Sequence, residues 1–224
     1  MRELWKNGRM EESEVDDIIS DREKNFPLPK LLDLEYFKKY RRWYYHELER
    51  GRYLGYRNYI NLLTYLAEVY SYNSEHARAF AKAFLDGKAD WRNSEAVFAE
   101  LIVYRYYIRL VYEGLIKSIS LDHKECDVIL ERLDNSRAFL EVFSIGHLNV
   151  TPGQVYDIKT HTQDAMASVR QKLLSKFEKQ RQMTQPRDNY AVIEADDISI
   201  ASNLDFAILG SCPVATKFGS TERK

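Results

Sequence analysis

The segment from Asn93 to Gly114 constrains the fold of this chain more than any other. It begins with the cap-like pair Asn93-Ser94 and continues as EAVFAELIVYRYYIRLVYE, which places apolar residues on nearly every side of a helix. A helix that is apolar all round is buried inside a layered structure rather than lying on a surface. The rest of the chain must therefore supply layers that cover it.

Two strand-like segments follow this helix. Residues 126–133 read CDVILERL and residues 138–145 read AFLEVFSI, and the turn-forming residues Asp134-Asn135-Ser136 lie between them. Strand formers on both sides of such a turn predict a β-hairpin. Residues 190–195, YAVIEA, predict a third strand further along the chain.

The order of the later elements predicts the fold class. We expect a loop over 147–163, an amphipathic helix over 164–183, a helix over 196–211 and a short last strand over 212–218. A strand, a crossover helix and another strand imply an α/β sandwich with a mixed sheet.

The first 90 residues carry almost no strand signal and predict helices over 31–51, 57–72 and 73–88. Asn73 or Ser74 is the expected N-cap of the third helix, and Gly87 is its expected stop. We therefore predict an N-terminal helical region over 1–90 and an α/β core over 91–224.

The composition is that of an ordinary globular protein. Hydrophobic residues make up 45% of the 224, charged residues 30%, and the formal net charge is −1, so overall charge predicts no partner. Two cysteines without C-x-x-C spacing, no signal-peptide pattern and no apolar run of membrane-spanning length favour a cytoplasmic protein without membrane contact. No Gly-rich phosphate loop, G-x-S-x-G elbow or dinucleotide fingerprint is present, and the histidines lack zinc-site spacing.

Three acidic residues lie within or beside apolar segments. Glu141 lies inside the second predicted strand, Asp127 opens the first, and Glu100 lies inside the apolar helix. A lone carboxylate in an apolar strand costs several kcal/mol unless it is paired, hydrogen-bonded or bound to a cation. Carboxylates on paired strands can converge on a hard cation such as Mg²⁺.

Each acid also has a simpler interpretation. Glu141 could face solvent on an edge strand, although Phe139, Phe143 and Ile145 share its face. Asp127 could cap a turn, and Glu100 could form an ion pair on its own helix with Arg105.

From Asn93 to Gly210, the pattern resembles the restriction-endonuclease-like PD-(D/E)XK nuclease superfamily. The resemblance rests on a helix with AEL, an Asp on a strand, LEVFSI, a helix of the form VRQKLLSKFEKQ, and then YAVIEADD and LDFAILG. It implies a three-layer α/β sandwich with a mixed central sheet and a DNA nuclease, with RNA as the second choice of substrate. It further implies Mg²⁺ or Mn²⁺ held by Glu100, Asp127, Glu141 and the Val142 carbonyl, and it leaves a homodimer open.

The chain departs from the family pattern at Phe143, which stands where the motif lysine normally lies. Lys172 and Lys176 on the following helix are the candidates for a lysine that has moved, and with Asp127 and Glu141 they form the expected catalytic set. The alternative is a catalytically inactive member of the fold that binds nucleic acid or a partner protein.

A tyrosine-rich basic stretch runs from Tyr36 to Tyr59 and holds seven basic and two acidic residues. Basic residues pair with phosphates, and aromatic rings stack on bases. The residues that we expect to contact nucleic acid are Lys38, Lys39, Arg41 and Arg42, together with Arg170 and Lys179 on the later basic helix. The alternative is that the tyrosines pack helix against helix while the basic residues face water.

Overall fold

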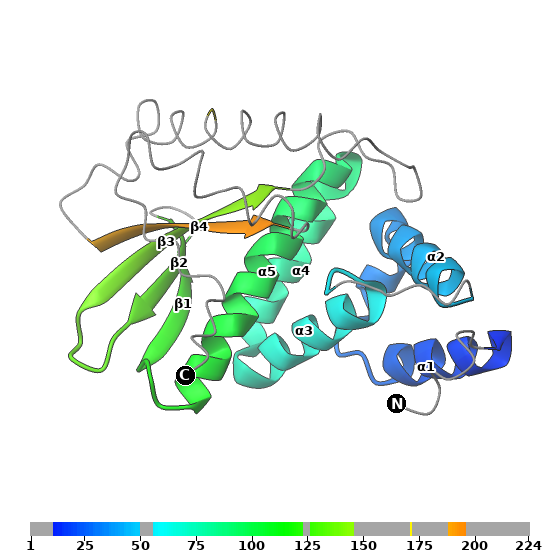
Figure 1. The fold of residues 1–224 in the computed structure, drawn as a ribbon, viewed down its shortest axis with the longest axis horizontal. Coiled ribbons are helices and arrows are strands. Elements are labelled where there is room, and N and C mark those ends of the chain that lie inside the picture. The colour runs from blue at the N-terminus through cyan, green and yellow to red at the C-terminus, as the bar shows by residue number, and fades with distance from the viewer. Residues whose placement is uncertain (1–10, 50–55, 123–125, 146–170, 172–187, 196–224) are drawn as a thin grey trace, which may run out of the picture. The chain divides into compact units, whose positions relative to one another are not determined.

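The computed structural model of the protein describes residues 11–49, 56–122, 126–145, 171 and 188–195. Within these ranges the chain is α/β, with five α-helices and one four-stranded mixed sheet (Figure 1). The chain divides into two compact units between Ile108 and Arg109, and each unit is described here by itself. This division falls inside the helix Trp91–Tyr112, whereas the boundary predicted from the sequence, 90/91, precedes that helix.

The helical unit confirms the predicted helical N-terminal region. Its helices are α1 (Glu12–Lys24), α2 (Glu35–Glu49), α3 (Tyr59–Tyr72), α4 (Ser74–Asp86) and the larger part of α5 (Trp91–Tyr112), with short 3₁₀ turns at Pro29–Asp33 and Gly87–Ala89. No helix in the described part of the chain is long and apolar enough to cross a membrane.

The predicted end signals of the third helix are confirmed. The Asn73 side-chain oxygen accepts the N–H groups of Glu75 and His76 at 3.0 and 3.1 Å, so Asn73 is the N-cap of α4, and α4 ends directly before Gly87. Asn58 caps α3 in the same way, through the N–H of Asn61 at 2.9 Å. The first strong helix begins later than predicted, since Pro29–Asp33 forms a 3₁₀ turn instead.

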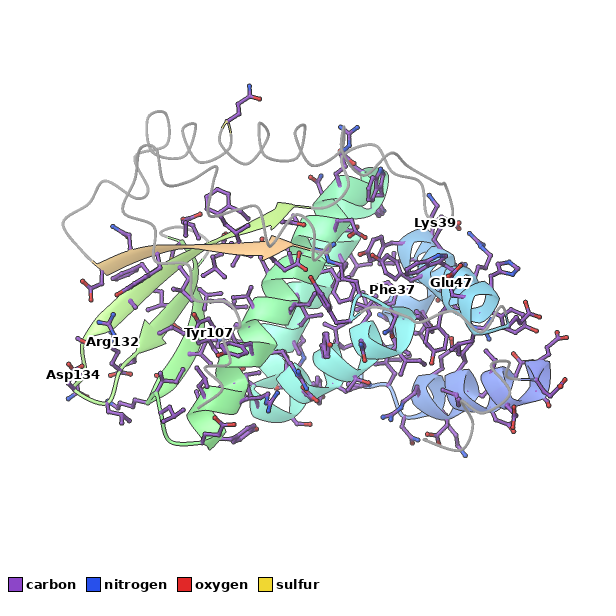
Figure 2. The ribbon with its side chains drawn as sticks, in the orientation of Figure 1. Phe37, Lys39, Glu47, Tyr107, Arg132 and Asp134 are labelled. Carbon is purple, nitrogen blue, oxygen red and sulfur yellow. The ribbon has the colours of Figure 1, made fainter. Side chains whose placement is uncertain are left out.

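Aromatic rings fill the core of the helical unit. Phe37 from α2 and Phe84 from α4 are fully buried and meet edge to face, with ring centroids 5.3 Å apart. Tyr36 packs against the same Phe84 ring at 5.6 Å. Figure 2 shows Phe37 within the helices and Lys39 pointing away from α2. Tyr36, Tyr44 and Tyr59 of the tyrosine-rich stretch are therefore part of the core, as the packing interpretation predicts for the tyrosines.

The second unit is built on the sheet. Its strands are β1 (Ser118–Asp122), β2 (Cys126–Glu131), β3 (Arg137–Ile145) and β4 (Asp188–Ala195), in that spatial order. β1–β2 and β2–β3 are antiparallel and β3–β4 is parallel, which confirms the predicted mixed sheet. β1 was not predicted, because the five residues SISLD are too short to show a clear period.

The β2–β3 hairpin has the predicted turn. Asn135 adopts a φ of 64°, a left-handed conformation that Asn tolerates better than most residues. The Asp134 carboxylate accepts the Ser136 N–H at 2.9 Å and the Ser136 hydroxyl at 2.6 Å. Figure 2 places Asp134 and Arg132 at this end of the hairpin, where Arg132 donates to Asp188 of β4 at 2.6 Å.

Candidate functional site

Asp127 and Glu141 lie on the same face of the hairpin. The last paired residues of β2 and β3 are Val128 and Leu140, and Asp127 and Glu141 are the next residues of the two strands. Because Ile129 is paired with Phe139 and alternate residues share a face, both acids lie on the Ile129 face. The hairpin therefore places these two predicted site residues on one face of the sheet.

Asp127 also contacts the backbone of the neighbouring strand. Its Oδ2 accepts the N–H of Val142 at 2.7 Å. A carboxylate that accepts a backbone N–H forms a charge-assisted hydrogen bond, which is stronger than a neutral one. Asp127 is thus held within the sheet by this hydrogen bond. Its partner is a strand residue, not a residue of a turn.

Glu141 is buried to an unusual degree for an acid. Its exposed fraction is 3%, and that of Phe143, two residues further along the same face, is 4%. The interpretation of Glu141 as a solvent-facing residue on an edge strand is therefore wrong, because β3 has β2 on one side and β4 on the other. Glu141 and Phe143 are therefore buried on one face of β3, whereas Phe139 on that face is only partly buried.

The donors at this point of the hairpin are oxygen atoms. Asp127 and Glu141 supply carboxylates, and the Val142 peptide lies beside Asp127. Cys126 belongs to the opposite, buried face, and its Sγ donates to the Val128 carbonyl at 3.3 Å. Among the described residues, no group of three or more His, Cys, Asp or Glu side chains could hold a metal ion. Two carboxylates and a carbonyl still fit Mg²⁺, which keeps several water ligands and uses one or two carboxylates.

Glu100 lies on α5 in the helical unit, whereas Asp127 and Glu141 belong to the sheet unit. Its participation with these two acids stays a prediction. Arg105, its suggested alternative partner, forms an ion pair with Glu68 of α3 at 2.5 Å and stacks over Tyr65 at 4.8 Å.

The predicted basic helix lies outside the described residues, apart from residue 171. This applies to both lysines proposed for catalysis, Lys172 and Lys176, and to the proposed phosphate contacts Arg170 and Lys179. Their roles remain predictions.

The four basic residues of α2 that we expect to contact nucleic acid fall into two groups: the arginines form ion pairs and the lysines do not. Arg41 donates to Glu23 at 2.9 Å, and Arg42 donates to Glu35 at 2.6 Å. The hydrogen bond from Arg42 is the largest of the causes that lower the pKa of Glu35. Lys38 and Lys39 are exposed and form no ion pair with another described residue. The basic surface of α2 is therefore centred on these two lysines.

Sequence reasoning missed a buried polar cluster in the helical unit. Glu95 of α5 accepts the hydroxyls of Tyr36 and Tyr40 at 2.8 and 2.5 Å, and its other oxygen pairs with Arg57. Arg57, which sequence analysis counted in the basic stretch, is only 3% exposed and lies over the Phe98 ring. Burial and the neighbouring Glu95 raise the pKa values of Tyr36 and Tyr40 well above their ordinary range. No local pattern reveals this cluster, because its other members lie 38 to 59 residues from Glu95 in the sequence.

Comparison with known proteins found no similar protein. No protein-family model matches the chain, and neither a curated protein nor a solved structure was found to be similar to it.

Proposed function

We propose that this protein is a divalent-cation-dependent phosphodiesterase that hydrolyses DNA, with a sheet unit of the restriction-endonuclease-like type. The proposal includes the three-layer sandwich, with Mg²⁺ or Mn²⁺ as cofactor. The observation that carries it is the position of Asp127 and Glu141 on one face of the hairpin, with Glu141 buried.

The proposal is supported by the free-energy cost of placing two carboxylates on this face of the sheet without a cation. Two like charges on one sheet face repel each other, and burial makes an ionised carboxylate still less favourable. A bound cation would offset both costs. The donor set contains only oxygen, which is the preference of Mg²⁺ and Mn²⁺.

The chain's own residues would have separate roles in hydrolysis. Asp127 and Glu141 would hold the cation, and Lys172 or Lys176 would stand in for the motif lysine that Phe143 replaces. Such a cation lowers the pKa of bound water and stabilises negative charge that develops on a phosphate.

Conservative amide variants of the two acids test the proposal. We expect purified protein to cleave DNA when Mg²⁺ or Mn²⁺ is added, and we expect Asp127→Asn and Glu141→Gln to lose at least about 100-fold in rate. Glu131→Gln is the matched control, since Glu131 lies on the same face of β2 and pairs with Lys117 instead. Cleavage that persists in both Asp127→Asn and Glu141→Gln would overturn the proposed mechanism.

A second function is favoured by Phe143 and by the exposed pair Lys38 and Lys39. A protein without the motif lysine could bind nucleic acid and not cut it. Neutralising two phosphate contacts should lower the slope of log K against log salt by about two. Lys38→Ala/Lys39→Ala should show that change in DNA binding, while the exposed pair Arg78→Ala/Lys82→Ala on α4 should not. An unchanged slope in the α2 variant would count against this function.

A further inference from the structure

We infer that Asp127 is a positioning residue that acts through Val142: its carboxylate holds the Val142 peptide so that the Val142 carbonyl oxygen faces the gap between β2 and β3. The orientation of the peptide is independent of any cation. The use of that carbonyl as a cation ligand rests on the proposed function.

The first step is the pattern of the β2–β3 ladder. Its paired residues end at Val128 and Leu140, and the next residue of β3 that faces β2 is Val142. In a regular ladder the N–H of Val142 would bond to the backbone of β2. Here it donates to the Asp127 side chain at 2.7 Å, so a carboxylate takes the place of a backbone carbonyl.

The second step is the direction of the Val142 carbonyl. The N–H and C=O groups of one strand residue point to the same edge, because a hydrogen-bonded pair exchanges both bonds with one neighbour. The N–H of Val142 points toward β2, so its carbonyl oxygen points toward β2 as well. The opposite edge of β3 is occupied by the parallel pairing with β4, where Val142 is aligned with Val192.

The third step concerns the two oxygens of Asp127. Only Oδ2 is needed to hold the amide. Oδ1 can then serve a cation together with the carbonyl that the same carboxylate has oriented. One side chain would thus prepare a backbone ligand and supply a second ligand itself, so that little reorganisation accompanies binding.

The test follows the Val142 peptide by NMR in metal-free protein and again with Mg²⁺. In deuterated wild-type protein we expect a scalar coupling across the hydrogen bond, between the Val142 nitrogen and the Asp127 carboxyl carbon. We expect amide exchange at Val142 to accelerate at least about tenfold in Asp127→Ala and to stay slow in Asp127→Asn, whose amide oxygen still accepts. Glu131→Ala is the control for loss of an acid from the same strand.

Mg²⁺ provides the second readout. We expect saturating Mg²⁺ to shift the Val142 carbonyl carbon in wild type and in Asp127→Asn, at a higher Mg²⁺ concentration in the variant. Absence of the coupling, or slow exchange in Asp127→Ala, would overturn the inference whatever Mg²⁺ does. If the amide effects are found but Mg²⁺ does not shift the carbonyl carbon, the orienting role of Asp127 stands and the proposed cation site fails. The wild-type coupling decides the matter even where Asp127→Ala does not fold.

Discussion

Arg57 and Glu95 form a buried ion pair that connects the segment before α3 to α5. The side chain of Arg57 is 3% exposed and that of Glu95 is 14% exposed, and two tyrosine hydroxyls of α2 complete the hydrogen bonding of the carboxylate. A buried pair is strongly destabilised when one partner is removed, because the other charge stays behind without compensation.

We therefore expect Glu95→Gln to lower the free energy of unfolding by about 3–5 kcal/mol, measured by urea denaturation. Glu35→Gln breaks an exposed pair with Arg42 and should cost less than about 1 kcal/mol. Equal losses in the two variants would contradict the importance assigned to the buried pair. Adding Arg57→Met to Glu95→Gln should recover part of the loss, since no unpaired charge then remains.

The partial burial of His76, beside Tyr104, predicts a pH dependence of stability. The two side chains meet at 2.5 Å, and burial lowers the pKa of His76 below its ordinary value. The folded protein then binds fewer protons than the unfolded chain, so this contribution to stability is complete above about pH 6.5 and is lost as the pH falls through the lowered pKa. The nearby Glu75 opposes the shift but does not reverse it.

Unfolding free energies of wild type and His76→Gln between pH 4.5 and 7.5 test this dependence. The wild-type curve should fall more steeply toward acid than that of the variant. His46→Gln, at an exposed position of α2, is the comparison for losing a histidine. Parallel curves for wild type and His76→Gln would refute the prediction.

The cap at Asn73 predicts a graded effect on α4. Its side chain accepts two N–H groups, so Asn73→Ala should cost about 1 kcal/mol while Asn73→Asp should be nearly neutral. Thermal and urea unfolding of the three proteins give the comparison. A loss of the same size in both variants would mean that the side-chain acceptor is not the cause.

Restoring the motif lysine tests the proposed function from the opposite direction. Phe143 shares a face with Glu141, so Phe143→Lys places an amine beside the proposed site. We expect it to destabilise the fold, because Phe143 is buried, yet to raise cation-dependent DNA cleavage at least about tenfold, since a positioned acid or base contributes about 10²–10⁴. Phe139→Lys, on the other side of Glu141, should destabilise without raising cleavage. A gain in both variants, or in neither, would argue against the assigned position of the site.

Prediction from sequence succeeded where a short segment carries its own signal. The hairpin, its Asp134–Ser136 turn and the Asn73 cap are confirmed, because each depends on hydrogen bonds between residues at most three apart or on a plain run of strand formers. It failed at β1, which is defined by its pairing with β2 and not by its own pattern. It also began the first strong helix at Leu31, inside the segment Pro29–Asp33, where the structure has a 3₁₀ turn.

The hairpin acids and the Arg57–Glu95 cluster show the same difference between what a short segment reveals and what it does not. The sequence alone determined that an acid lies within an apolar strand and that another acid opens its hairpin partner. The tertiary structure decided that Glu141 is almost fully buried, that Asp127 bonds to the Val142 peptide, and that Arg57 is paired inside the core. Burial and partners of a charge depend on segments far apart in the chain, and local pattern carries no information about which of them come together.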